Sequence, residues 1–534
     1  MSDAEGIIAC PFDAKNCRYF SLNSYDFILY ILYIARSDLA NALRNFHKII
    51  SPAHNKFMQI NCKEAADAVQ GEFSEYTDVL RMDFNVGGRA AALFYIDGFV
   101  DKIAFESSIL RPLKRQETLE YPYADTINQI TALTTPMKTV QTPQEAAKIV
   151  SEGDIALVID GAEGIFIFSE RAYQTRGIQE PPVTNVLRGP REGFVEDVKI
   201  NMTMLRRKLK TPKLTFKKAF AGKYTDTPVI ICYIDGVASP DVVDEVEKRI
   251  NAIDMDGVVE SSYIARYLET NYRSLFTQVG TSEKPDIIAA KMLEGRVAII
   301  VDGSPMVLTV PFILFEHFQA SEDYYIKSFR ASFIRIVRLM ALVFAIALPG
   351  AYVALQEYQY QMFPLKFLIS IMNSIYGIPF TPTLEMLSIL IIFEILNEAS
   401  VRMPRYVGMA LSVVGAIVLG ETAVNAGLFS TPAILVISIS TIGLYCVPDA
   451  TEASSILRVL FVAIAGVAGL MGLILAALAL IAYLADLRSF GTSYLAPFAP
   501  LIERDWQDGL IKESIRDMTE RPYSIPTWNR VRRR

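Results

Sequence analysis

Charged residues are almost absent from one long stretch of the chain, and this depletion constrains the fold more than any other feature. Residues 336–485 hold 12 charged residues in 150 positions, whereas the other 384 positions hold 98. Within the stretch, 339–356 is a run of 18 residues without a charge and 459–485 is a run of 27. Uncharged runs of this length can cross a bilayer as helices. The sequence therefore predicts a soluble part joined to a membrane part.

The remaining charges are balanced, which excludes several classes of protein. Residues 1–335 carry 38 basic and 44 acidic residues, and the whole chain has a net charge of −6. Nucleic-acid binding is not expected, because it normally needs a clustered basic surface. The five cysteines form no CxxC pair and the three histidines are dispersed, so neither a disulfide framework nor a metal site is predicted. The N-terminus lacks the features of a signal peptide, so the soluble part is expected in the cytoplasm.

An apolar, β-rich run that ends in Asp-Gly occurs four times between residues 78 and 315. Its aspartates are Asp97, Asp160, Asp235 and Asp302. Asp-Gly after a strand marks a tight turn, since glycine supplies a positive φ and aspartate bonds the local backbone. A helical segment follows the first and third copies and a second apolar run follows the others, which suggests two tandem α/β units, with a chance repeat of a common strand end as the alternative. We expect these aspartates to form turns at strand ends, not to catalyse a reaction.

A strip of different character connects the two units. It contains Arg188, Gly189, Pro190, Arg191, Glu192, Gly193 and Phe194, and a helix with Arg206 and Arg207 follows. Arginines and free backbone N–H groups suit a phosphate or another anion. The favoured alternative is a linker that arginine salt bridges dock onto both units.

These patterns predict an α+β cytoplasmic domain of two tandem α/β units, followed by an α-helical multi-pass membrane domain. The expected boundaries are a poorly patterned segment 1–75, a first α/β subdomain 76–182, the connecting strip 183–219, a second α/β subdomain 220–330, a membrane domain 331–487 and a cytoplasmic tail 488–534.

The number of membrane crossings is predicted from the segments between basic regions. Lys327, Arg330, Arg335 and Arg338 precede the first crossing, so the positive-inside rule places the soluble domain inside. The visible segments are 339–356, 384–400, 406–426, 432–447 and 459–485, yet two inner ends require an even number. We favour four crossings, with 431–448 dipping in and out because Ser438, Ser440, Thr441 and Gly443 interrupt it. Six crossings, with 365–380 as the extra one, is the alternative.

Carboxylates inside the membrane segments are the candidate functional residues. Such groups are costly in a bilayer and usually face a pore, a partner or water. Glu394, Asn397 and Glu398 share one helical face, Glu385 lies on another face near the outer end, and Glu421 with Asn425 forms a second candidate. A polar lining of a cation path or an inter-subunit seam is favoured over a helix that lies flat at the interface.

Enzyme signatures are absent from the sequence. It contains no GxxxxGK[ST], GxGxxG or HExxH motif and no nucleophile elbow. We therefore expect no catalytic residues, no metal and no cofactor.

Several segments resemble one protein family, the A subunits of bacterial spore germinant receptors (the GerA family). They are LFYIDGFVDK (93–102), GDIALVIDG (153–161), LRGPREGFVEDVKINMTMLRRKLKTP (187–212), EGRVAIIVDGSP (294–305), FEILNEASVRMP (393–404), VVGAIVLGETAVNAGLFSTP (413–432) and RSFGTSYLAPFAP (488–500).

This resemblance implies a multi-pass protein of the spore inner membrane. It implies partnership with a transporter-like B subunit and a lipoprotein C subunit, and a homo-oligomeric ring that forms or gates a monovalent-cation channel for germination. An amplifying paralogue without its own germinant, a secondary transporter and a membrane-anchored signalling protein or enzyme remain alternatives.

Overall fold

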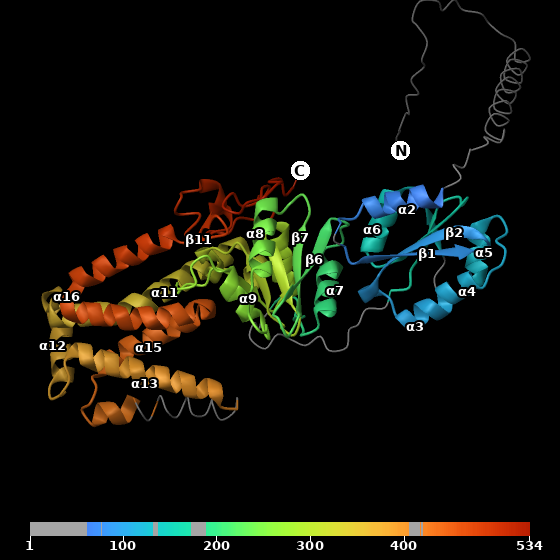
Figure 1. The fold of residues 1–534 in the computed structure, drawn as a ribbon. Coiled ribbons are helices and arrows are strands. Elements are labelled where there is room, and N and C mark those ends of the chain that lie inside the picture. The colour runs from blue at the N-terminus through green and yellow to red at the C-terminus, as the bar shows by residue number, and fades with distance from the viewer. Residues whose placement is uncertain are drawn as a thin grey trace, which may run out of the picture. The chain divides into compact units, whose positions relative to one another are not determined.

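The computed structural model describes residues 61–75, 77–131, 137–171, 188–404, 417 and 420–533. Most of the predicted N-terminal segment 1–75 and of the predicted crossing 406–426 lie outside these described residues. The described chain forms two α/β units, a helical region and a C-terminal tail (Figure 1).

The first unit is a five-stranded antiparallel sheet with helices on both faces. Its strand order is β1-β2-β4-β5-β3, and every neighbouring pair is antiparallel. The strands are β1 (Val79–Val86), β2 (Arg89–Ile96), β3 (Lys138–Val140), β4 (Ile155–Ile159) and β5 (Ile165–Phe168). The helices are α2 (Cys62–Gly71), α3 (Lys102–Phe105), α4 (Arg111–Lys114), α5 (Tyr123–Ile130) and α6 (Pro143–Ser151).

Helix α2 lies in the stretch for which the sequence predicted little pattern. The Asn61 side chain caps it by accepting a hydrogen bond from the Lys63 backbone N–H. Ala66 and Val69 are buried in the same core as Phe94 of β2. The first unit therefore begins at this helix, before the predicted boundary at residue 76.

The second unit repeats the architecture of the first. Its strand order is β6-β7-β9-β10-β8, again with antiparallel neighbours. The strands are β6 (Leu214–Ala221), β7 (Thr227–Ile234), β8 (Gly280–Ser282), β9 (Val297–Val301) and β10 (Val307–Val310). The helices are α7 (Val198–Lys208), α8 (Pro240–Asn251), α9 (Ser261–Leu268) and α10 (Pro285–Leu293).

The two sheets share one topology, since β1 to β5 correspond in turn to β6 to β10. The strands that end at the four Asp-Gly copies are β2, β4, β7 and β9. Helices follow β2 and β7, and antiparallel hairpins join β4 to β5 and β9 to β10, as the sequence predicted. The repeat is therefore structural and not a chance match.

Alternating side chains bury both faces of each sheet. On β7, Ile231 packs with Val242 and Val246 of α8, whereas Ile230 packs with Leu205 of α7 on the opposite face. Neighbouring residues of a strand point to opposite faces. A strand covered on both sides therefore needs an unbroken apolar run, which is why VIICYI carries no polar alternation.

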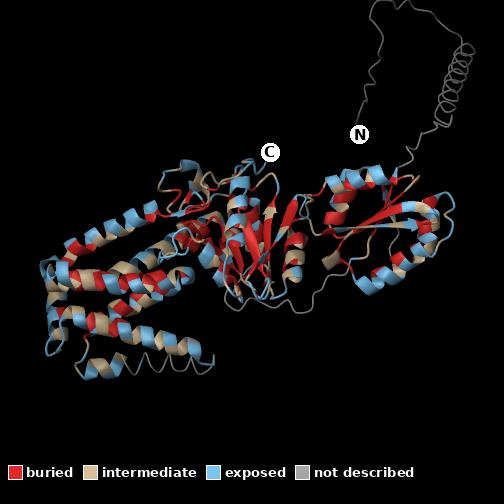
Figure 2. Cartoon of the chain, viewed as in Figure 1, coloured by how far each residue is buried: buried red, intermediate tan, exposed pale blue. Residues whose placement is uncertain are grey.

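Five described helices form the helical region. They are α11 (Ser328–Glu357), α12 (Leu365–Ile375), α13 (Pro382–Arg402), α15 (Thr431–Tyr445) and α16 (Thr451–Asp486). Among the described residues, the helices long and apolar enough to cross a membrane are Ser328–Glu357 and Pro448–Asp486. Only 17% and 33% of their most apolar windows are buried within the chain. Figure 2 shows many exposed residues along these helices, so their apolar side chains are left for lipid or another chain.

The two ends of the helical region are distinguished by their contacts. At the end that we call inner, the ring of Phe276 in the second unit lies 6.3 Å from that of Tyr483 near the end of α16. At the opposite, outer end, Glu357 accepts hydrogen bonds from the backbone N–H and the hydroxyl of Thr383 at 3.0 and 2.8 Å. Helix α12 lies between these two joined helix ends, so 365–380 does not supply the extra crossing that the sequence analysis considered.

Helix α15 is continuous, and the predicted interruption is not observed. The Ser438 hydroxyl donates to the Ile434 carbonyl within the helix, and the Ser440 hydroxyl donates to the Ala345 carbonyl of α11 at 2.6 Å. Gly443 lies against α11, where a Cβ atom would come within 2.5 Å of the Ala341 carbonyl oxygen. The small and polar residues thus serve close helix packing, as is usual between membrane helices.

Helix α16 bends sharply at Gly469, which has φ 60° and ψ −150°. Gly350 of α11 lies against both Phe461 and Leu473, although twelve residues separate them. The two arms of α16 therefore run side by side against α11, and Figure 1 shows the bend at the outer end. The uncharged run 459–485, predicted to be one crossing, is therefore not one straight helix, because the chain breaks at Gly469 in a conformation that glycine adopts readily.

The tail returns to the second unit. Strands β11 (Arg488–Ser489) and β12 (Thr492–Ser493) form a short hairpin. The Ser489 hydroxyl donates to the Gln278 carbonyl at 2.7 Å and accepts from the Phe312 N–H at 3.1 Å. The Trp528 N–H donates to the Val237 carbonyl at 3.0 Å. The chain thus enters and leaves the helical region at the same unit.

Candidate functional site

An ion pair joins α13 to α16 inside the helical region. Arg458 Nη2 donates to Glu394 Oε2 at 2.7 Å, and Arg458 Nη1 lies 3.4 Å from the Thr441 hydroxyl of α15. The Arg458 side chain is 3% exposed, whereas that of Glu394 is 48% exposed. A buried guanidinium depends strongly on its carboxylate, because an unpaired buried charge costs several kcal/mol.

The other two residues of the predicted polar face have different partners. Asn397 Oδ1 accepts a hydrogen bond from the Tyr445 hydroxyl at 3.3 Å. Glu398 pairs at 2.5 Å with Arg402 one turn along its own helix, and both side chains are largely exposed. The structure therefore divides the face: Glu394 and Asn397 meet neighbouring helices, and Glu398 does not.

Glu385 is buried at the start of α13, 1% exposed. Its carboxylate accepts a hydrogen bond from the backbone N–H of Ser430, the residue that caps α15. Glu421 and Asn425 are exposed in the residues that precede α15. Most of the chain just before Glu421 lies outside the described residues. The predicted candidates thus form no single cluster.

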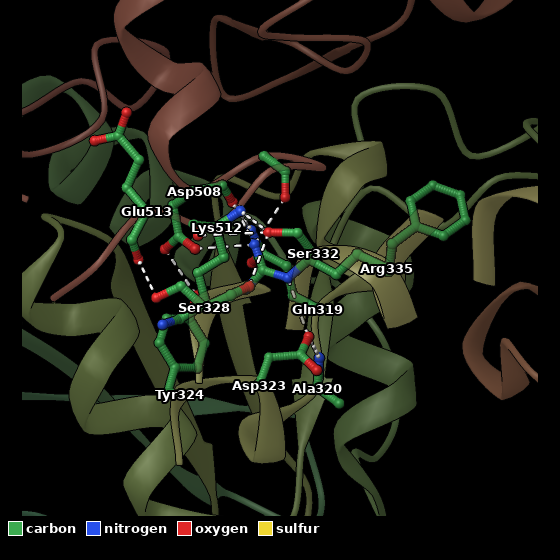
Figure 3. Close-up of polar contacts among 12 residues, drawn as sticks. Gln319, Ala320, Asp323, Tyr324, Ser328, Ser332, Arg335, Asp508, Lys512 and Glu513 are labelled. Carbon is green, nitrogen blue, oxygen red and sulfur yellow. Dashed lines mark hydrogen bonds and ion pairs between the residues drawn. The ribbon is translucent and has the colours of Figure 1, made fainter. Parts of the chain in front are cut away.

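A buried polar cluster ties the start of α11 to the tail (Figure 3). Arg335 Nε donates to Asp323 at 3.1 Å, and Nη1 donates to the Asp508 carboxylate at 3.0 Å and to the Gly509 carbonyl at 2.7 Å. Arg338 donates to the same Asp323 carboxylate at 2.9 Å. Two of the four basic residues used for the positive-inside prediction are therefore occupied by acidic partners, while Lys327 and Arg330 are exposed.

A second buried network lies at the end of the second unit. Glu316 accepts from Arg296 at 3.1 Å and from the Ile313 N–H at 3.0 Å, and its other oxygen lies 2.7 Å from Lys291 Nζ. Burial disfavours the charged carboxylate, but Arg296 and Lys291 outweigh it and hold the pKa of Glu316 below its usual value. The Glu316 carboxylate therefore stays ionised at neutral pH.

His317 lies beside a cavity where the second unit meets α11 and α16. Its Nε2 is 3.3 Å from the Tyr494 hydroxyl, and its ring packs edge-on at 5.0 Å from Phe312. Asp449 and Glu452 also line the cavity. Burial lowers the pKa of His317, against the opposing field of Asp449, so the imidazole is neutral at pH 7.

The connecting strip is held by its arginines. Arg206, 0% exposed, forms a bidentate pair with Asp78 at the start of β1 in the first unit. It also donates to the Thr211 and Leu214 carbonyls at 2.7 and 3.1 Å. Arg207 lies 3.2 Å from Glu192 of the strip itself. This arrangement favours the docked linker over an anion site, because the guanidinium of Arg206 has no donor left facing solvent.

The rest of the strip packs against parts of the chain that lie far along the sequence. The Phe194 N–H donates to the Glu283 carbonyl at 2.7 Å, and Gly189 has φ 126° against the Tyr325 ring. Arg188 and Arg191 are exposed.

The strand-end aspartates act at longer range than the sequence analysis expected. Asp160 and Asp302 accept hydrogen bonds at 3.2 Å from the first N–H groups of α2 and α7, at Cys62 and Val198. Helix N-termini attract carboxylates, which explains why Asp160 and Asp302 bind distant helix ends and not the backbone of their own turns. The equivalent bonds in both units are a further sign of the repeat.

The other two strand ends differ from each other. Asp97 pairs with Lys102 at 2.9 Å and lies 3.8 Å from Lys199 of α7. The Asp235 N–H donates to the Lys213 carbonyl at 2.8 Å. Positive φ angles occur at Gly161, Gly236 and Gly303, as predicted, whereas the chain at Asp97–Phe99 forms a 3-10 turn instead.

Three important residues were not singled out from the sequence: Arg458, Asp323 and Asp508. Arg458 carried a signal, since it is the sole basic residue between 406 and 487. The two aspartates carried none, because their importance depends on partners that the fold brings together. Among the described residues, no group of three or more His, Cys, Asp or Glu side chains is placed to hold a metal ion.

Comparisons with known proteins give a consistent result. Residues 67–524 match the family model for the Bacillus/Clostridium GerA spore germination protein. The chain is 34% identical over 469 residues to spore germination protein KA of Bacillus subtilis (strain 168), and the match covers 86% of each chain. It is 30% identical over 473 residues to spore germination protein GerLA of Bacillus cereus, covering 88% of this chain and 96% of that one.

A solved structure is also similar. It is the crystal structure of the N-terminal domain of the A subunit of the Bacillus megaterium spore germinant receptor GerK3, at 27% identity. The match covers 47% of this chain and 92% of that chain, with a TM-score of 0.37.

Proposed function

Because this chain belongs to the GerA family of Bacillus and Clostridium spore germination proteins, we propose that it is the A subunit of a spore germinant receptor. In this role it is a multi-pass protein of the spore inner membrane, with its α/β units in the cytoplasm. It assembles there with a transporter-like B subunit and a lipoprotein C subunit.

The membrane placement is supported by the helical region and its attachment. Helices α11 and α16 have the length and composition of spans, and most of their apolar surface is uncovered within the chain. The start of α11 and the tail after α16 are tied together through Arg335 and Asp508. Two ends on one side require an even number of crossings. The exposed Lys327 and Arg330 support a cytoplasmic location for that side, in line with the positive-inside rule.

We further propose that the subunit oligomerises into a ring that forms or gates a monovalent-cation channel. The observation that carries this proposal is the ion pair of Glu394 and Arg458, which joins two helices in the part of the chain that is poorest in charges. Ionisable residues at membrane depth are costly and mark ion pathways or partners. Glu394 is half exposed within the single chain, so it faces either a path or a neighbouring subunit.

The pair also gives the channel a chemical switch. While Arg458 holds the Glu394 carboxylate, the pair carries no net charge and does not attract cations. When the helices separate the pair, the free carboxylate attracts cations into the path. Germinant binding in the assembled receptor would supply the energy for this separation.

Potassium flux through the purified protein in liposomes tests the proposal. Glu394→Gln removes the attracting carboxylate and is expected to lower flux, whereas Arg458→Gln frees the carboxylate and is expected to raise it. Glu398→Gln, the same change at an exposed position four residues away, is the control and is expected to leave flux unchanged.

Opposite effects of the two substitutions would support a gating pair. If both variants lowered flux equally while remaining oligomeric, the pair would only hold the helices together. If oligomeric wild-type protein showed no flux even with its B and C subunits and germinant present, the channel proposal would be rejected.

A further inference from the structure

Glu385 is a buried carboxylate without a basic partner. Among the described residues, no lysine, arginine or histidine forms an ion pair with it, although it is 1% exposed. Its recorded hydrogen bond comes from the backbone N–H of Ser430. In an apolar region of the chain, an uncompensated carboxylate costs several kcal/mol, and a positively charged group normally offsets that cost.

Unpartnered polar atoms lie beside this carboxylate. Tyr352 of α11 is 7% exposed and lies close to both Ser430 and Glu385, and its hydroxyl has no partner in good hydrogen-bond geometry. Gln356 lies one turn further along α11, on the same face, and neither its amide oxygen nor its amide nitrogen has a partner. Buried polar groups are normally satisfied. Tyr352, which lies close to Glu385, and Gln356, one turn further along, thus place unpartnered polar atoms on one face of α11 toward the outer end of the helices.

The N-termini of the neighbouring helices α13 and α15 offset part of the negative charge of Glu385. Glu385 lies in the first turn of α13 and binds the capping residue of α15. A helix N-terminus carries roughly half a positive charge, which stabilises a carboxylate there. Half a charge does not neutralise the carboxylate, and it leaves the oxygens of Tyr352 and Gln356 unused.

We propose that Glu385, Tyr352 and Gln356 form a binding site for one monovalent cation, either an alkali-metal ion or the ammonium group of a small amine. The inference deepens the proposed function and rests on it for the relevance of cations to this protein. A cation can use the carboxylate, phenol and amide oxygens together as ligands. A divalent ion is disfavoured, since such ions are usually held by more than one carboxylate.

The test is cation-dependent stability of the full-length protein in nanodiscs. Thermal unfolding is measured while N-methyl-D-glucamine chloride is replaced by potassium, sodium or methylammonium chloride at constant ionic strength. A ligand that binds only the folded state raises the Tm in a saturable way. The three salts separate an alkali-metal site from an ammonium site.

Two variants and a control assign the response to this site. Glu385→Gln is expected to abolish the saturable rise in Tm. Tyr352→Phe keeps the contact of Glu385 with Ser430 and is expected to raise the half-saturating concentration about tenfold, through loss of one contact to a charged ligand. Glu398→Gln, on the exposed side of the same helix, is expected to respond like the wild type. If Glu385→Gln fails to fold, the half-saturating concentration of Tyr352→Phe still tests whether the cation binds at this site.

Each outcome bears on the site separately from channel activity. A saturable rise that Tyr352→Phe weakens establishes the site, even in protein that passes no potassium. An equal response of wild type, Tyr352→Phe and Glu398→Gln would overturn it. So would an infrared band of a protonated carboxyl group that persists in saturating potassium and disappears in Glu385→Gln.

Discussion

Arg335 is a fully buried charge that holds three segments together. It joins the turn at Asp323, the body of α11 and the tail at Asp508. Arg206 does the same between Asp78 of the first unit and the strip before the second. Arginine suits both positions, because its planar guanidinium group can donate to carboxylates and carbonyls at the same time and stays charged when buried. Removing one partner of such a pair typically costs about 3–5 kcal/mol.

His317 is a buried base at the junction between the second unit and the helices, and its protonation is expected to loosen that junction. Burial lowers its pKa from the ordinary value of 6.5. The unfolded chain therefore binds the proton more readily, so this residue contributes stability above about pH 6.5, which is lost as the pH falls toward the lowered pKa.

We expect His317→Gln to remove that part of the pH dependence. The measurement is the Tm of wild type and variant across the interval below pH 6.5, where a titrating group changes stability by up to about 1.4 kcal/mol per pH unit. The difference between the two profiles isolates His317, because the carboxylates are common to both. Parallel profiles would show that His317 is not protonated in this range.

At the scale of elements, the sequence predicted what depends on local pattern. The apolar runs ending in Asp-Gly marked β2, β4, β7 and β9, because strands buried on both faces need unbroken apolar residues. The polar face of α13 was also visible from spacing. The partners of Glu394 and Glu385 were not visible, because Arg458 and Ser430 lie far along the chain.

The bend in α16 was also missed, although three glycines at 466, 469 and 472 marked it. An uncharged run of 27 residues is read most simply as one straight span. The bend is held by side chains from α11: the Tyr358 hydroxyl donates to the Gly466 carbonyl at 2.7 Å, and the Leu470 N–H donates to Gln359 Oε1 at 3.4 Å. These bonds satisfy backbone groups that the broken helix frees.

Gly469→Ala is expected to destabilise the helical region. Its φ of 60° strains any other residue by about 1–3 kcal/mol, and a Cβ atom would lie 3.0 Å from the Tyr358 ring, which adds a clash. Gly377→Ala is the matched control, since φ there is 89° but nothing lies within 4 Å. The Tm of both variants is measured in detergent. A loss no greater than that of Gly377→Ala would contradict a tightly packed bend.

At the scale of the whole molecule, the described helices fix a path between the inner and outer ends. Helix α11 runs outward, and α13 returns inward from Thr383. Helix α15 also runs inward, since its start meets Glu385 and Tyr445 near its end meets Asn397. The arms of α16 then run outward and back. The chain between α13 and α15 is therefore expected to return outward, which predicts six crossings, because α15 counts as a full crossing and α16 supplies two instead of one.

Cysteine labelling tests this topology in a variant that lacks the five native cysteines. Single cysteines are introduced at Lys248 of α8, at Gln361 after α11 and at Asp517 of the tail, all exposed positions. A membrane-impermeant maleimide applied to the outer face is expected to label Gln361→Cys alone, because the second unit and the tail share the inner side through Arg335 and Asp508. Permeabilised membranes should label all three. Labelling of Asp517→Cys from outside would mean an odd number of crossings and would separate the tail from the unit to which it is hydrogen-bonded.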